Sequence, residues 1–150
     1  LDTGKSPQPR WAASVVGLAS ANPLNVAAVY AGGYQFPVRV DSDLLKRGRE
    51  RFDIYCSVCH DRVGTGRGKI VERGYLRPPS YHIDRLRQAP LMHFYDVISN
   101  GYGAMPSYSD KLSPGDRWAV IAYVRALQLS QEMPYADLKP EQRKNLKERQ

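Results

Sequence analysis

The two cysteines of the chain lie three positions apart, and a histidine directly follows the second one. They are Cys56 and Cys59 with His60, in the segment YCSVCHDRVGTGRGK (Tyr55–Lys69). A disulfide between residues this close would restrict almost no loop of the unfolded chain, so a structural bridge is a poor explanation. A redox dithiol of the thioredoxin type needs its CxxC at the start of a helix inside a βαβ unit. The residues before Cys56 instead follow a helical pattern, and no strand pattern flanks the motif, which disfavours a redox dithiol.

A structural zinc site needs four protein ligands. Besides Cys56, Cys59 and His60, the chain offers only His82 and His93 as further histidines, and adjacent cysteine and histidine ligands fit a closed tetrahedral site awkwardly. The pattern Cys-x-x-Cys-His is typical of the attachment of a c-type haem. We therefore expect one covalently bound haem c, with zinc and a redox dithiol as the alternatives. In this interpretation His60 lies beside the porphyrin ring and binds the iron from one face.

An electron-transfer haem usually takes a second protein ligand, and methionine or histidine are the candidates. Met105 lies in a segment rich in glycine, NGYGAMPSY (100–108), where small residues let the backbone approach a flat macrocycle and Pro106 stiffens the loop. Met92 falls within a helical pattern, and Met133 lies beyond the last helix. The sequence thus favours Met105 as the second axial ligand, with either of the two other histidines as the rival.

Three helices are predicted around these residues, at 41–55, 90–101 and 113–130. The first can be capped by Asp41, Ser42 or Asp43, and the last by Ser113 followed by Pro114. Gly48 lies one turn before Phe52, where a second helix could cross closely. No segment shows sustained alternation of apolar and polar residues, so the predicted fold class is all-α.

We expect an uncharged N-terminal arm at 1–40, a domain at 41–130 and a charged tail at 131–150. Residues Trp11–Val38 carry no charge, yet polar residues, glycines and prolines interrupt any apolar run that could span a membrane. No basic segment followed by an apolar run appears, so no signal peptide is expected within this numbering. The arm either binds along a partner or wraps its own domain. The predicted last helix is apolar nearly all round, which predicts that a partner covers part of it.

The chain carries a formal net charge of +7. Residues 62–87 contain seven basic and two acidic side chains, which form either a solvated loop or a basic rim that attracts an acidic redox partner. Nucleic-acid binding is not expected, because the basic residues are dispersed and no recognised module is present. The segment GTGRGK (64–69) lacks the first glycine and the final Ser/Thr of a phosphate-binding loop, so we expect an ordinary glycine-rich turn.

Together, CSVCH, Met105–Pro106 and helices able to cross at Gly48 resemble class I c-type cytochromes. Four longer segments resemble the mono-haem cytochrome c subunit of bacterial alternative complex III, a quinol-oxidising membrane complex: RGRERFDIYCSVCHDRVGTGRG, RPPSYHIDRLRQAP, HFYDVISNGYGAMPSY and DRWAVIAYVRALQLSQ.

The resemblance implies a small helical domain around one haem, with thioether bonds to Cys56 and Cys59 and axial ligation by His60 and Met105. It also implies that the carbonyl of Pro78 or Pro79 accepts a hydrogen bond from the axial histidine.

An iron with both axial positions filled transfers single electrons and is no enzyme site, so we expect an electron-transfer subunit at the periplasmic or extracytoplasmic face of a bacterial membrane. Its partners would be other subunits of a membrane-bound redox complex, with a small copper protein, another cytochrome or a terminal oxidase as acceptor. A diffusible cytochrome, an oxidase-associated cytochrome domain and, more remotely, a haem sensor or peroxidase-like enzyme remain alternatives.

Overall fold

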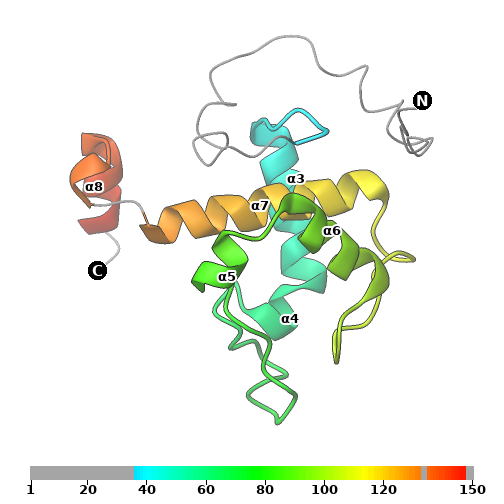
Figure 1. Cartoon of the computed structure of the whole chain (residues 1–150). Helices are drawn as coiled ribbons and strands as arrows, with labels where there is room; N and C mark the ends of the chain where they lie inside the picture. Colours follow the sequence, from blue (N-terminus) through cyan, green and yellow to red (C-terminus); the bar gives the residue numbers. More distant parts are fainter. Residues whose placement is uncertain (1–35, 133–134, 148–150) are drawn as a thin grey trace, which may run out of the picture.

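The computed structural model describes residues 36–132 and 135–147 (Figure 1). Its helices are α3 (Ser42–Tyr55), α4 (Ser57–His60), α5 (Asp84–Arg87), α6 (Leu91–Asn100), α7 (Pro114–Glu132), the 3₁₀ turn η1 (Tyr135–Asp137) and α8 (Pro140–Lys147). Within these two ranges the only β-type pairing is an isolated bridge between Tyr102 and Met105. The prediction of an all-α domain is therefore confirmed.

Side-chain caps begin the two longest helices where the sequence indicated. Asp41 caps α3, because its Oδ1 accepts a hydrogen bond of 2.9 Å from the backbone N–H of Leu44. Ser113 precedes α7, and its Oγ accepts a hydrogen bond of 3.1 Å from the backbone N–H of Asp116. These bonds satisfy amide groups that have no partner within the helix, and so define where each helix starts.

The first and last helices of the domain cross at Gly48 (Figure 1). A Cβ atom at this position would lie 2.0 Å from the carbonyl oxygen of Ala119 and 3.0 Å from the Cβ of Tyr123, so no side chain fits there. One turn later Phe52 is fully buried, and its ring centroid lies 5.3 Å from that of Tyr123. The predicted crossing at Gly48 and Phe52 is confirmed.

The described end of the N-terminal segment belongs to the core of this domain. Phe36, Val38 and Val40 are buried, and the Phe36 ring packs edge-on against Trp118 at a centroid distance of 6.3 Å. These residues precede the predicted domain boundary at residue 41, and they cover part of α7. The expectation that the arm binds along a partner or wraps its own domain concerns mainly residues 1–35, which lie outside the described residues.

Helix α7 is buried largely by its own domain. Its buried residues occupy several faces: Trp118, Ala119, Val120, Ile121, Ala122, Val124, Arg125 and Gln128. They pack against α3, α6 and the segment that precedes α3. Residues 36–40 and 81–89 contribute to this cover, and the expected contact of a partner with the rest of the helix stays a prediction. No helix in the described part of the chain is long and apolar enough to cross a bilayer.

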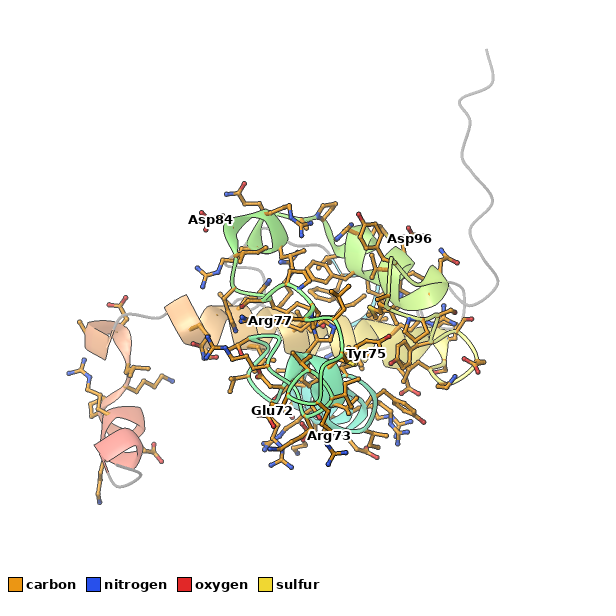
Figure 2. The ribbon with its side chains drawn as sticks, turned by 90° about the horizontal axis from the view of Figure 1, so that it is seen from below. Glu72, Arg73, Tyr75, Arg77, Asp84 and Asp96 are labelled. Atoms are coloured by element: carbon orange, nitrogen blue, oxygen red, sulfur yellow. The ribbon has the colours of Figure 1, made fainter. Side chains whose placement is uncertain are left out.

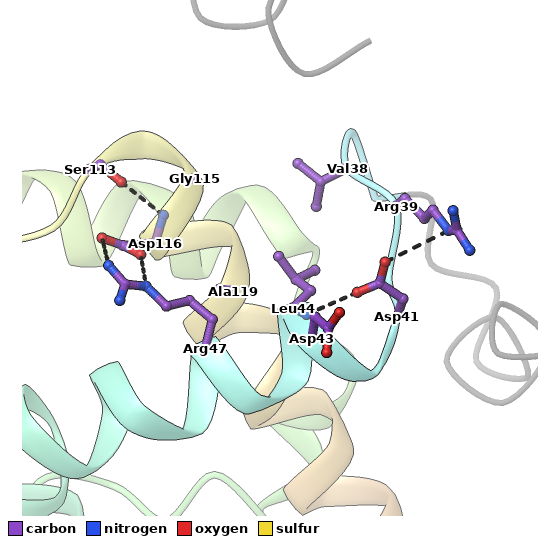
Figure 3. Close-up of a pocket in the computed structure, with 10 residues that line it drawn as sticks. All are labelled: Val38, Arg39, Asp41, Asp43, Leu44, Arg47, Ser113, Gly115, Asp116 and Ala119. Atoms are coloured by element: carbon purple, nitrogen blue, oxygen red, sulfur yellow. Dashed lines mark hydrogen bonds and ion pairs between the residues drawn. The ribbon is translucent and has the colours of Figure 1, made fainter. Parts of the chain in front are cut away.

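A pocket of about 430 Å³ lies between residues 38–41 and the first turns of α3 and α7 (Figure 3). Val38, Leu44 and Ala119 supply apolar lining, and charged groups including Asp41, Arg47 and Asp116 surround them. The pocket lies at the opposite end of α3 from Cys56. It is therefore separate from the cysteine motif.

Candidate functional site

One helical turn carries the two cysteines and the histidine. Cys56 ends α3, and its carbonyl oxygen accepts hydrogen bonds from the backbone N–H groups of Cys59 (3.1 Å) and His60 (2.9 Å). Cys56 and His60 are buried, whereas Cys59 is half-buried. Both thiols are free. Helical geometry therefore brings two sulfur atoms and one imidazole into a single short segment.

The two thiols do not have the character of a reactive dithiol. Burial raises the pKa of Cys56 to about 12, and the neighbouring Cys59 adds to this effect. Burial also raises the pKa of Cys59 above its ordinary value. A redox-active CxxC instead depends on a lowered thiol pKa. Across residues 36–132 and 135–147, no group of three or more His, Cys, Asp or Glu side chains is arranged to hold a metal ion.

The imidazole of His60 is neutral and aligned with an aromatic ring. Burial lowers its pKa to about 4, against a smaller opposing effect of the Asp61 carboxylate. Its ring stacks on Tyr81 with a centroid distance of 4.6 Å and an interplanar angle of 13°. The Nδ1 atom is buried and has no hydrogen-bond partner among the residues that the structure describes. A neutral imidazole with a ring nitrogen that bonds to no protein group is suited to act as an iron ligand.

The loop after His60 closes around the carboxylate of Asp61. That carboxylate accepts hydrogen bonds from the backbone N–H groups of Val63 (2.7 Å), Thr65 (3.0 Å) and Arg67 (3.1 Å), and from the Thr65 hydroxyl. Partial burial by itself would raise the pKa of Asp61. These hydrogen bonds, with one from the Gly64 amide, lower it below the ordinary value. The predicted glycine-rich turn is confirmed, and its amides bind the chain's own carboxylate.

Gly66 ties this loop to the segment that contains the prolines. Its φ is 79°, and its N–H donates to the carbonyl of His60 at 3.0 Å. A Cβ atom here would lie 2.3 Å from the carbonyl oxygen of Pro78. The Pro78 carbonyl thus packs on Gly66. Neither this carbonyl nor that of Pro79 accepts a hydrogen bond from His60 Nδ1.

Met105 lies in the loop between α6 and α7, half-buried against the core. Two reciprocal hydrogen bonds of 3.0 Å join the backbones of Tyr102 and Met105 in a tight turn. Gly101, with φ of 80°, allows the Met105 carbonyl to approach, since a Cβ there would lie 2.7 Å from that oxygen. The Tyr75 hydroxyl donates to the Ala104 carbonyl at 2.9 Å, which joins the turn to the loop that follows the cysteines.

Arg117 joins α7 to the residues on both sides of this turn, a role that the sequence did not predict. Its guanidinium donates to the hydroxyl of Ser99 (2.8 Å) and to the carbonyls of Leu112 (3.1 Å) and Ser109 (3.3 Å). The charged group also lies 5.5 Å from the centroid of the Tyr95 ring. An arginine in the first turns of a predicted helix carries no local signal for the contact with Ser99, which lies on the preceding helix α6.

Tyrosines connect the cysteine motif to the methionine loop. The pKa values of Tyr81 and Tyr108 are raised by burial, and Cys56 and Cys59 raise both further. Tyr55 on α3 packs against Tyr108 with a ring centroid distance of 6.3 Å. Tyr108 follows Met105 by three residues. The methionine loop therefore borders the motif.

The other histidines and methionines are less well placed. His82 Nε2 lies 2.7 Å from the carbonyl oxygen of Val63 and is taken up by that contact. His93 is half-buried on α6. Met92 is 57% exposed on the same helix, and Met133 lies outside the described residues. Of the sequence-predicted ligands, Met105 is the one whose loop is joined to the cysteine motif by tyrosines.

The basic segment 62–87, which follows the cysteine motif, forms an exposed surface. Figure 2 shows Arg73, Tyr75 and Arg77 on it, near the acidic Glu72. All seven basic side chains except Arg87 are exposed. One ion pair offsets Lys69, whose Nζ lies 3.1 Å from the Glu72 carboxylate. Leu76, 72% exposed, adds an apolar group between the basic ones.

Comparison with known proteins gives one result. A family model described as cytochrome C oxidase, cbb3-type, subunit III matches residues 43–124, more than half of the chain. The matched range includes the CSVCH motif and Met105, and it runs from the start of α3 into α7. No curated protein matches the chain.

Proposed function

The chain belongs to the family described as cytochrome c oxidase, cbb3-type, subunit III, and we propose that it transfers single electrons through one covalently attached haem c. A c-type cytochrome domain implies haem c and an electron-transfer role. The observation that carries the specific assignment is the single buried turn that holds Cys56, Cys59 and His60.

We infer that Cys56 and Cys59 hold the cofactor through two thioether bonds. Each thiol would hold one vinyl carbon through a carbon–sulfur bond, with the thiol hydrogen ending on the other vinyl carbon, so that no oxidant or leaving group would be required. The bound haem c would supply a one-electron ferric/ferrous couple.

His60 and Met105 are the proposed axial ligands. Filling both positions leaves no place for a substrate, which favours an electron carrier over an enzyme. A methionine ligand raises the reduction potential and suits a late acceptor in an electron-transfer chain. Tyr81 packs over the imidazole, and Tyr108 packs against Tyr55 next to Cys56, so both rings help to exclude water from the surroundings of the ligands.

Replacing each of two methionines tests this assignment. Met105→Ala should lower the reduction potential and let the ferrous protein bind carbon monoxide rapidly, because one axial position opens. Met92→Ala, at an exposed site on α6, should do neither. Potentiometry and carbon monoxide binding measure both effects. Loss of the methionine-ligated spectrum in Met92→Ala, with Met105→Ala unchanged, would refute the assignment.

A haem sensor or peroxidase-like enzyme is the more remote alternative, because such proteins need an open or labile axial position. The unsubstituted ferrous protein discriminates between them. Slow or absent carbon monoxide binding supports the electron carrier, and rapid binding supports the sensor or enzyme.

Two assemblies compete for this domain. The resemblance of the four quoted segments supports a subunit of alternative complex III, and the family match supports an oxidase-associated cytochrome equally well. Cytochrome c domains of this type are typically extracytoplasmic, and we propose the periplasmic face of the cytoplasmic membrane. Purification from native membranes and identification of the accompanying subunits would distinguish a quinol-oxidising complex, an oxidase and a diffusible carrier.

The exposed basic segment 62–87 favours an acidic redox partner. The same segment contains Tyr75, whose hydroxyl bonds to the turn that carries Met105, so its exposed charges lie near that turn. Electron exchange with such a partner should slow as salt rises from about 0.01 to 0.15 M, because the Debye length falls from roughly 30 to 8 Å. Stopped-flow rates measure this dependence. Rates that do not change over this range would exclude electrostatic steering.

A further inference from the structure

Helix α7 contains an arginine that is almost completely buried. Arg125 is 2% exposed. Its Nη1 donates to the carbonyls of Leu86 (3.2 Å) and Arg87 (3.0 Å) and to Oε1 of Gln128 (2.7 Å). Its Nη2 donates to the carbonyl of Ala89. The guanidinium thus collects the backbone carbonyls at the end of the short helix α5.

Burying a charge is costly unless hydrogen bonds replace its hydration. Here the carbonyls of the 86–89 segment and the ring of Phe94, 4.7 Å from the guanidinium, surround Arg125. Helix α5 has only four residues and cannot satisfy its own C-terminal carbonyls. Arg125 therefore determines where the 86–89 segment lies against α7.

A second buried side chain extends this contact towards the cysteine motif. Gln128, 4% exposed, donates from Nε2 to the carbonyl of Tyr81 at 2.7 Å, while its Oε1 accepts from Arg125. The backbone N–H of Tyr81 donates a hydrogen bond of 2.9 Å to the carbonyl of Gly64. Both backbone polar groups of Tyr81 are therefore held, the carbonyl by Gln128 and the N–H by Gly64. The Tyr81 ring lies flat on His60. An unbroken series of contacts therefore runs from Arg125 through Gln128 and Tyr81 to the imidazole.

We propose that Arg125 and Gln128 are positioning residues that hold Tyr81 against His60 and thereby set the orientation and solvent exclusion of the proximal imidazole. The inference rests on the proposed role of His60 as an iron ligand. A hydrogen bond to Nδ1 is the usual way to orient a ligating histidine. Among the described residues nothing bonds to His60 Nδ1, so the stacked Tyr81 ring is the contact left to orient the imidazole.

Substitution of the two buried residues tests the inference. Gln128→Leu removes the bond to the Tyr81 carbonyl with little change in volume. Arg125→Lys keeps the charge but cannot reach three carbonyls at once. Both should speed amide hydrogen exchange in residues 81–89 about tenfold or more, a readout that does not require redox activity. In the haem-loaded protein both should lower the reduction potential, because water gains access to His60 and stabilises the more highly charged ferric state.

Matched variants separate positioning from general stability. Arg143→Lys alters another arginine that bonds backbone carbonyls, those of Leu138 and Ala136 beside α8, and should change neither measurement. Tyr81→Leu should reproduce the lower potential, whereas Tyr81→Phe, which keeps a ring to stack on His60, should retain most of the original value. In Gln128→Leu/Tyr81→Leu the potential shifts should not add, since both changes remove the same contact.

The outcomes distinguish this inference from the function on which it rests. Faster exchange in Gln128→Leu with an unchanged potential would show that the contact only stabilises the fold, and would overturn the inference while leaving the function intact. An unsubstituted protein without thioether-bound haem would overturn the proposed function and the inference with it. If Arg125→Lys fails to fold, the Gln128 and Tyr81 variants decide the question.

Discussion

The two proposed ligands are held in different ways. His60 lies on a helical turn that also carries both cysteines, is buried, and is covered by the ring of Tyr81. Met105 lies in a half-buried turn between two helices, held by Tyr75 from one side and Arg117 from the other. A ligand beside its covalent attachment is kept at the site by that attachment, so the rest of the fold has only to orient it and exclude water. A ligand distant in sequence depends on long-range contacts, so the methionine side should be the more easily disturbed.

The largest change in the free energy of unfolding is expected when alanine replaces Gly66, beside His60, and a smaller one when it replaces Gly103, beside Met105. Gly66→Ala places a Cβ 2.3 Å from the Pro78 carbonyl at a φ of 79°. Left-handed backbone costs roughly 1–2 kcal/mol for alanine, and the forced backbone shift costs about 1–3 kcal/mol more. Gly103→Ala meets no atom within 4 Å at a φ of 57°, so only the first cost, roughly 1–2 kcal/mol, applies.

Urea unfolding measures the loss in free energy of unfolding for each of the two variants. Equal losses in Gly66→Ala and Gly103→Ala would show that the loop beside His60 is packed no more tightly than the turn that carries Met105.

A smaller effect is expected at Arg117. Arg117→Lys loses most of the bonds to Ser99, Leu112 and Ser109. Hydrogen bonds from charged groups contribute about 1.5–3 kcal/mol each. The contact that the lysine ammonium retains, and its hydration, offset part of this loss. We expect a net cost of about 1–2 kcal/mol. We also expect Met105 to dissociate at a lower denaturant concentration than the one at which the domain unfolds.

The absorption band of the methionine-ligated ferric form monitors this step, and far-ultraviolet circular dichroism monitors unfolding. Arg49→Lys, an exposed change on α3, serves as the control. Coincident loss of both signals in Arg117→Lys would mean that the methionine side has no separate stability.

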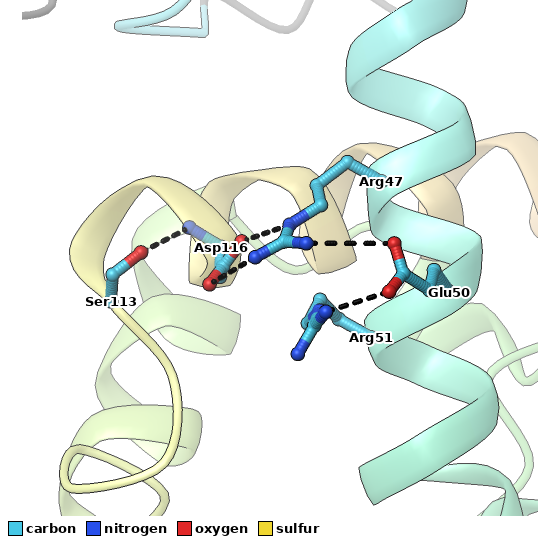
Figure 4. Close-up of polar contacts among 5 residues, drawn as sticks. All are labelled: Arg47, Glu50, Arg51, Ser113 and Asp116. Carbon is cyan, nitrogen blue, oxygen red and sulfur yellow. Dashed lines mark hydrogen bonds and ion pairs between the residues drawn. The ribbon is translucent and has the colours of Figure 1, made fainter.

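The smallest effect concerns an ion pair that joins α3 to α7. Arg47 on α3 makes a two-point contact with Asp116 on α7, with Nε–Oδ1 2.7 Å and Nη2–Oδ2 3.2 Å (Figure 4). Partial burial by itself would raise the pKa of Asp116, but the bond and charge of Arg47, with smaller contributions from Ser113 and Arg51, lower it below its ordinary value. A carboxyl with a lowered folded-state pKa stabilises the protein above its unfolded pKa of about 3.9.

That stabilisation should disappear as pH falls from about 4 through the folded-state pKa of Asp116. Asp116→Asn should therefore be less stable than the unsubstituted protein at pH 6 and nearly equal to it at the acid end. Urea midpoints between pH 6 and 2 measure the difference, with Asp43→Asn, exposed on α3, as control. A difference that stays constant across this range would contradict the linkage.

Local signals in the sequence were sufficient for much of the fold. The helix starts at Asp41 and Ser113 were predictable because a cap acts on amides two or three residues away. The crossing at Gly48 was predictable because a glycine one turn before a large apolar residue marks close helix contact. The burial of Phe36 and Val38 was not predictable, because these residues belong to no periodic segment and pack on a helix far along the chain.

The same distinction applies to the candidate site. The sequence by itself determined the cysteine–histidine turn, because three residues on one helical turn need no tertiary contact to lie together. It also indicated Met105 through the small residues around it. Only the tertiary structure decided that Tyr81 stacks on His60, that Arg117 anchors the methionine turn and that Arg125 is buried. Each of these joins segments distant in sequence, and a hydrogen bond or ring contact between such segments leaves no periodic trace in either one.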